Sequence, residues 1–152
     1  MSDPSATSLA YELVHTLHPA GEGGSSGLRY GEIPRFSMQR IVDGLECKAS
    51  LDSKSTFLDI GAGLGKPCIH VCLENSARQV IGVEVDGVRW RQAMETLDCL
   101  ITTSCFTKRT SRVFFAHANI LSPSFNLNGV SHVYVFNVGM HAHVMQRICQ
   151  LF

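Results

Sequence analysis

The stretch from Thr56 to Gly65, with the sequence TFLDIGAGLG, constrains the fold of this chain more than any other segment. It begins with a short apolar run around Leu58, of the kind that fills a parallel strand covered on both faces. Gly61, Gly63 and Gly65 then offer bare backbone and positive φ angles, so that a ligand can lie against the main chain where the next helix begins. The pattern predicts a strand, a ligand-binding turn and a helix.

Two acidic residues narrow the kind of ligand. Asp59 lies near the strand end, two positions before Gly61, and Glu84 ends the next apolar run, 19 residues after Gly65. In nucleotide-binding βαβ units, an acid at about this distance accepts hydrogen bonds from ribose hydroxyls. We therefore predict a ligand with a ribose group. The alternative is a glycine-rich turn that binds nothing.

Composition places the chain among globular proteins of about one domain. It has 152 residues, of which 45% are hydrophobic and 17% charged, and no run of 18 apolar positions that predicts a membrane span. Its first residues carry no secretory signal. Lys plus Arg and Asp plus Glu both number 13, so a broad electrostatic surface for DNA is not expected, and DNA contact would be indirect or made by other segments.

Periodicity predicts the order of elements. Residues 1–27 are expected to form a short helix and a Gly/Ser-rich linker, and residues 28–152 the ligand-binding domain. Four apolar runs at 57–60, 80–85, 113–116 and 133–136 alternate with helical patterns, which predicts a doubly wound parallel α/β sheet. Ligands bind at the carboxyl ends of such strands, which is where Asp59, Glu84, Asn119 and Asn137 fall.

The chain from residue 28 to 152 resembles the Dot-one (disruptor of telomeric silencing) histone lysine methyltransferases. The resemblance rests on the order and spacing of short segments, namely Tyr30-Gly31-Glu32, the glycine turn, Gly82-Val83-Glu84, Asn119-Ile120 and Val135-Phe136-Asn137. It implies a Rossmann-like class I methyltransferase fold, which usually has seven strands, whereas this sequence holds about four. It also implies S-adenosyl-L-methionine as the cofactor.

The resemblance further implies roles for the residues of the first half of the site. Tyr30 and Glu32 would lie in a loop that closes over the methionine part of the cofactor, and Tyr30 would also be a catalytic residue. Asp59 and the turn glycines, Gly61, Gly63 and Gly65, would hold its amino acid and ribose region. Glu84 would accept hydrogen bonds from both ribose hydroxyls.

Three residues of the second half complete the implied site. Asn119 and Ile120 stand where the family has Asp-Phe, so adenine would meet a neutral amide and lose an aromatic neighbour, which predicts weaker adenine binding. Asn137 matches a strand-four asparagine that faces the methyl group and would orient an incoming amine as a catalytic residue. No metal site is expected, because His141 and His143 are two apart and would lie on different sides of a helix.

The resemblance implies that the methyl acceptor is a lysine of a nucleosomal core histone. A histone or nucleosome would then be the partner and the nucleus the location; otherwise the location is cytoplasmic. Two alternatives stay open: a class I methyltransferase for another protein or a small molecule, and a catalytically inactive S-adenosylmethionine-binding paralogue.

Overall fold

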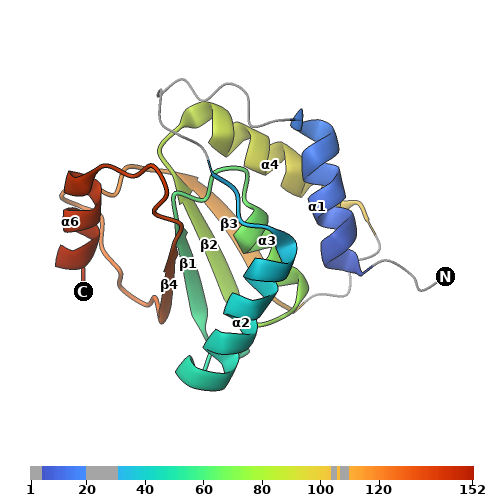
Figure 1. Cartoon of the computed structure of the whole chain (residues 1–152), viewed down its shortest axis with the longest axis horizontal. Coiled ribbons are helices and arrows are strands. Elements are labelled where there is room, and N and C mark those ends of the chain that lie inside the picture. The colour runs from blue at the N-terminus through green and yellow to red at the C-terminus, as the bar shows by residue number, and fades with distance from the viewer. Residues whose placement is uncertain (1–4, 20–30, 104–105, 107–109) are drawn as a thin grey trace.

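The computed structural model describes residues 5–19, 31–103, 106 and 110–152 (Figure 1). Helices separate the first three strands as predicted, whereas residues 118–131, between the third and fourth strands, form no helix. The helices are α1 Ala6–Leu17, α2 Arg35–Ala49, α3 Lys66–Leu73, α4 Gly87–Ile101 and α6 Ala142–Gln150. The strands are β1 Thr56–Ile60, β2 Gln79–Glu84, β3 Arg112–His117 and β4 His132–Val135. None of the helices in the described ranges is long and apolar enough to cross a membrane.

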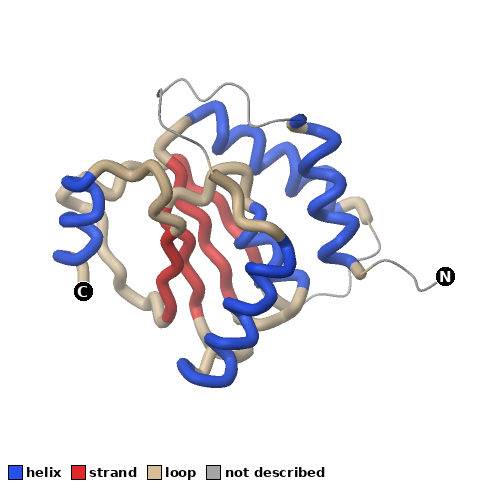
Figure 2. Tube along the Cα trace, viewed as in Figure 1, coloured by secondary structure: helices blue, strands red, loops and turns tan. Residues whose placement is uncertain are grey.

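The four strands of the described part form one parallel sheet in the order β3-β2-β1-β4 (Figure 2). The chain crosses from β1 to β2 and on to β3 in one direction, and β4 then returns to the free edge of β1. The order therefore reverses between β1 and β4, and parallel pairing puts all four carboxyl ends at one edge. The predicted doubly wound sheet with four strands is confirmed.

Alternate residues of β1 divide the core into two layers. Phe57 is fully buried against Met38 and Val42 of α2 and Cys68 of α3. Leu58 points the other way, into a cluster with Ile148 of α6 and residues of the segment between β3 and β4. Because helices cover both faces, every position of β1 is buried, which explains why its sequence shows no polar alternation.

The first helix belongs to the same core as the rest of the chain. Ala10 and Val14 of α1 are 0% and 1% exposed, and they pack in one cluster with Ile69 and Leu73 of α3 and Leu100 of α4. The sequence pattern had grouped this helix with a linker, outside the domain. The helix joins the core because the apolar side chains on one of its faces become buried against α3 and α4. The predicted Gly/Ser-rich linker lies mostly outside the described residues.

Candidate functional site

The three glycines form the predicted turn between β1 and α3. Gly61, Gly63 and Gly65 have φ angles of 81°, 55° and 81°, in the left-handed region that favours glycine. The backbone N–H groups of Gly61 and Ala62 donate to the carbonyl oxygen of Val83, at 2.8 and 3.0 Å, and so fasten the turn to β2. Gly65 caps the amino end of α3. The positive φ angles predicted for this turn are confirmed.

Two of these glycines face crowded surroundings. A Cβ atom at Gly65 would overlap the ring of Phe115, which packs under the turn from β3. A Cβ atom at Gly61 would lie 2.6 Å from the Cε atom of Met140, which follows β4. The absence of a side chain at Gly65 therefore lets the Phe115 ring pack beneath the turn. The absence of a side chain at Gly61 leaves room for the Met140 side chain.

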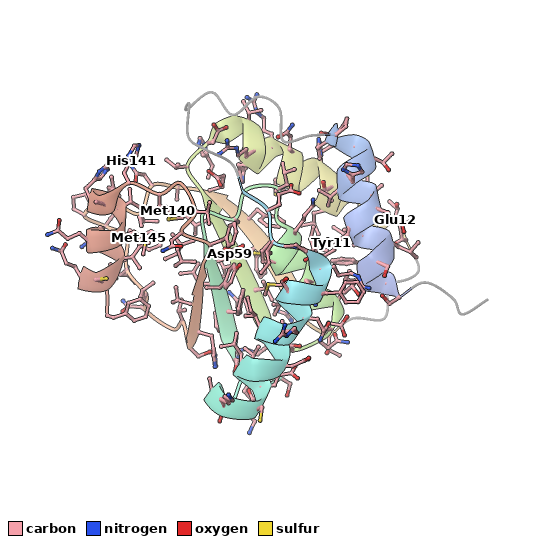
Figure 3. The ribbon with its side chains drawn as sticks, viewed as in Figure 1. Tyr11, Glu12, Asp59, Met140, His141 and Met145 are labelled. Atoms are coloured by element: carbon pink, nitrogen blue, oxygen red, sulfur yellow. The ribbon has the colours of Figure 1, made fainter. Side chains whose placement is uncertain are left out.

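A cavity opens at the carboxyl ends of β1, β2 and β4, beside the glycine turn. It brings together five of the predicted site residues, Glu32, Asp59, Gly61, Gly63 and Glu84, along with Gly31. Its volume of about 150 Å³ is below the range of roughly 300 to 1,000 Å³ that suits larger ligands. Figure 3 shows Met140 on the α6 side of Asp59. The Cε atom of Met140 approaches Gly61 closely, so a ligand that lies against this part of the turn would displace this flexible side chain.

Glu84 is held rigidly at the end of β2. Its side chain is buried, with one carboxylate oxygen, Oε2, accepting from the Gly63 N–H at 2.7 Å and the other, Oε1, accepting from the Asp86 N–H at 2.8 Å. A carboxylate offers about four lone-pair positions, so each oxygen retains acceptor capacity. The arrangement can therefore accept two further hydrogen bonds from a pair of hydroxyl groups.

Asp59 lies deeper, beneath the turn. It is 1% exposed, and the Sγ–H of Cys68 points at its carboxylate from 3.8 Å. Burial raises the pKa of Asp59 to about 7, the Cys68 contact opposes this shift, and the negative charge of Glu84 adds to it. A cationic group entering the cavity would favour the ionised form of Asp59, so the site is suited to a positively charged ligand.

Asp59 is expected to make the protein less stable as the pH rises. Its pKa is about 7 in the folded chain against an ordinary value of 3.8, so between these values the folded state binds more protons than the unfolded state. The free energy of unfolding should therefore fall across this window and level off above it. Urea unfolding at about pH 5 and about pH 8 should show a smaller fall for Asp59→Asn than for the wild type.

The matched control for this prediction is Asp98→Asn, which changes an exposed carboxylate of α4. It should follow the wild type at both pH values. If Asp59→Asn also kept the full wild-type fall, Asp59 would not be the group responsible.

Polar side chains that the sequence analysis did not single out also line the cavity. Lys66, directly after the last glycine, forms an ion pair with Glu32. Tyr134 of β4 contributes to the lining, and its hydroxyl is buried with no hydrogen-bond partner among the described residues. The position of Lys66 next to the turn was visible in the sequence, but nothing in the pattern indicated the direction of its side chain.

Four of the predicted site residues that the structure describes do not line the cavity, namely Gly65, Asn119, Ile120 and Asn137. Ile120 is buried in the core cluster around Leu58, and Asn119 is exposed, with its side-chain oxygen accepting from the Leu121 N–H at 2.9 Å. Asn137 is exposed, although its neighbours Phe136 and Val138 line the cavity. Tyr30 lies outside the described residues. The cofactor or catalytic roles predicted for these four residues and for Tyr30 stay predictions.

The two histidines after β4 do not lie on different sides of a helix as expected. The rings of His141 and His143 stack with centroids 5.6 Å apart. The expectation was wrong because His141 precedes α6 as its N-cap residue, in an extended conformation, so helical spacing does not apply to it. Among the described residues, no group of three or more His, Cys, Asp or Glu could hold a metal ion.

The fold has clear counterparts among solved structures. A protein from Pyrococcus horikoshii, described as a candidate RNA methyltransferase, matches with a TM-score of 0.60 at 20% identity, covering 94% of this chain and 67% of that chain. An S-adenosylmethionine-dependent methyltransferase from Geobacter sulfurreducens, in complex with S-adenosylhomocysteine, matches with a TM-score of 0.55 at 13% identity. This match covers 95% of this chain and 51% of that chain. TrmK from M. capricolum, in complex with S-adenosylhomocysteine, matches with a TM-score of 0.53 at 11% identity. This match covers 78% of this chain and 47% of that chain. The fold is that of Rossmann-like methyltransferases, and the chain spans about half the length of the last two structures.

Sequence comparison identifies the family. No curated protein sequence matches the chain. The family described as "Histone methylation protein DOT1" matches residues 23–152, which include the glycine turn, Glu84 and all four strands. The chain belongs to the DOT1 family of histone methylation proteins.

Proposed function

We propose that this chain binds S-adenosylmethionine in the cavity beside the glycine turn and belongs to a S-adenosylmethionine-dependent methyltransferase. The observation that carries the proposal is the buried Glu84 carboxylate beside the glycine turn. It accepts hydrogen bonds from the backbone N–H groups of Gly63 and Asp86, which fix its orientation. Both the DOT1 family and the solved structures in complex with S-adenosylhomocysteine support this ligand class.

The residues present fit this cofactor. Glu84 retains acceptor capacity for the two ribose hydroxyls, and bare backbone at Gly61 allows the adenosyl group to approach the main chain once Met140 has moved. S-adenosylmethionine carries a sulfonium and an ammonium group, and the lining contains the acids Asp59 and Glu32. When bound, S-adenosylmethionine would supply an electrophilic methyl group.

To catalyse methyl transfer to an amine, the protein must mainly position the two reactants, and acid–base catalysis is less important. The nitrogen must approach the methyl carbon in line, at about 3 to 3.5 Å, in a site from which water is excluded. Phe136, Val138 and Met140 supply apolar surface on the β4 side of the cavity. Apolar surroundings disfavour the ammonium form of an entering lysine, whose ordinary pKa is about 10.4. We assign no general base, and we assign Asn137 the role of orienting the amine.

For the acceptor we propose a lysine of a nucleosomal core histone, which makes the histone or nucleosome the partner and the nucleus the place of action. The family description supports this choice. The chain has 13 basic and 13 acidic residues, so attraction to nucleosomal DNA phosphates would depend on other segments or on a partner protein. The exposed position of Asn137 favours a second candidate, a binding module that holds the cofactor without transferring methyl groups.

The test of the proposed acceptor is transfer of tritium from labelled S-adenosylmethionine to reconstituted nucleosomes, free histones and small amines. We expect label on nucleosomal histone, lowered roughly 100-fold by Asn137→Ala because a misplaced amine no longer lies in line. The control Asn128→Ala changes another exposed asparagine, outside the cavity lining, and should keep wild-type transfer. Labelling of small amines with none on histone would rule out the histone acceptor.

A further inference from the structure

A short turn follows β4 and leads towards α6. The N–H group of Met140 donates to the carbonyl oxygen of Asn137 at 3.1 Å, and Gly139 has a φ angle of 86°. These values describe a β-turn with glycine at its third position, where φ is positive. We call residues 137–140 the β4–α6 turn. Three of them, Val138, Gly139 and Met140, line the cavity.

The β4–α6 turn contacts the cavity wall on two sides. On one side, the Cε atom of Met140 lies so close to Gly61 that a Cβ atom on this glycine would be 2.6 Å from it. On the other side, a Cβ atom on Gly31 would lie 3.5 Å from Cγ1 of Val138. Gly61 belongs to the glycine turn and Gly31 to the segment before α2, and both line the cavity. The β4–α6 turn therefore spans the cavity between these two segments.

Few contacts hold the β4–α6 turn in this position. Asn137 and Gly139 are exposed, and Val138 is 54% exposed. Met140 is half-buried and packs against the core cluster around Leu58. In the described part of the chain, the backbone hydrogen bond of this turn is the one between its own first and last residues. Glycine at the third position can change its backbone angles at little steric cost. The turn can therefore rotate without breaking a helix or a strand.

We propose that the β4–α6 turn is a gate on the cofactor cavity, and that Met140 covers Gly61 until S-adenosylmethionine displaces it. This inference rests on the proposed function. The cofactor can contact the bare backbone of Gly61 only after the Met140 side chain has left, and Met140 then loses its packing against the core. The free energy of this displacement opposes binding. The free chain therefore binds the cofactor more weakly than a chain with an open cavity would.

The sign of one substitution distinguishes a gate from a wall of the site. If Met140 only lines the bound cofactor, shortening its side chain removes contacts and weakens binding. If Met140 is a gate, Met140→Ala opens the cavity and the affinity should rise. Because a minor open state is populated at about 0.1 to 10%, the variant should bind S-adenosylmethionine and S-adenosylhomocysteine roughly 10-fold or more tightly than the wild type. Titration calorimetry measures both affinities.

Two variants are matched controls. Met145→Ala shortens a half-buried methionine of α6 that packs in the same core cluster but lies outside the cavity lining, so it should keep wild-type affinity (Figure 3). Met140→Leu nearly conserves the side-chain volume, so the gate should remain and the affinity should stay near that of the wild type. Thermal unfolding monitored by circular dichroism shows that each variant is folded at the temperature of the titration.

NMR spectroscopy observes the movement itself. With methionine methyl groups labelled with carbon-13, the free wild-type chain should show a nuclear Overhauser effect between the Met140 methyl group and the Cα hydrogens of Gly61, because these groups lie close together. Saturation with S-adenosylhomocysteine should abolish this effect. The Met145 methyl group should keep its contacts with the core cluster in both states.

The outcomes distinguish the gate from the proposed function. If Met140→Ala binds the two ligands no more tightly than the wild type, or if the effect between Met140 and Gly61 persists in the complex, the gate is wrong while the cofactor site stands. If neither the wild type nor Met140→Ala binds either ligand, the proposed function itself fails and the inference falls with it.

Discussion

Replacing Glu84 with alanine is expected to weaken the binding of S-adenosylmethionine by about 1.5 to 3 kcal/mol or more, which is roughly 10- to 150-fold or more. The carboxylate is buried and oriented by two backbone N–H groups, so it can accept from the ribose hydroxyls without reorganising. Those bonds are charge-assisted and stronger than neutral ones. Titration calorimetry on the wild type and the variant measures the difference directly.

Two comparisons isolate the role of Glu84. Glu84→Gln keeps the shape of the side chain and loses its charge, so it should bind with intermediate affinity. Glu46→Ala removes an exposed carboxylate of α2, outside the cavity lining, and should bind as the wild type does. If Glu84→Ala bound with wild-type affinity, the ribose would lie elsewhere.

Replacing Gly65 with alanine is expected to destabilise the fold by about 2 to 5 kcal/mol. The φ angle of 81° costs a residue with a Cβ roughly 1 to 2 kcal/mol. The new methyl group would also overlap the Phe115 ring, and overpacking of this kind costs about 1 to 3 kcal/mol. Phe115 packs against the clusters on both sides of α3, so it has little room to move away.

Urea unfolding followed by circular dichroism measures this change. Gly44→Ala is the matched control, because Gly44 lies inside α2 and a Cβ there meets nothing within 4 Å. That substitution should stabilise the protein by up to about 1 kcal/mol, since alanine favours a helix interior. Equal stability of Gly65→Ala and the wild type would show that neither the φ angle nor the Phe115 contact constrains this position.

The central part of the fold could be predicted because its signals are local. Gly61, Gly63 and Gly65 must follow a strand and begin a helix to make a turn with positive φ, and the distance to Glu84 equals one crossover helix and one strand. Parallel pairing then brings Asp59 and Glu84 to the same edge of the sheet. These relations follow from chain geometry and do not depend on distant packing.

Other features depended on contacts between distant segments. The apolar stripe of α1 predicts a buried face but not its partners, so its packing on α3 and α4 was missed. Ile120 follows β3 closely, yet the core around Leu58 draws its side chain away from the cavity. Lys66 turns towards the cavity because Glu32, 34 residues earlier, lies opposite it. A local sequence pattern predicts none of these packing partners and side-chain orientations.

The most direct test of the account is calorimetric titration of the 152-residue chain with S-adenosylmethionine, S-adenosylhomocysteine and, separately, NAD. A ribose-binding acid after a glycine turn serves dinucleotides as well as adenosyl cofactors, so NAD is the informative competitor. We predict saturable binding of one S-adenosylmethionine or S-adenosylhomocysteine per chain and no heat with NAD. Saturable binding of NAD, with no heat from either adenosyl ligand, would contradict it.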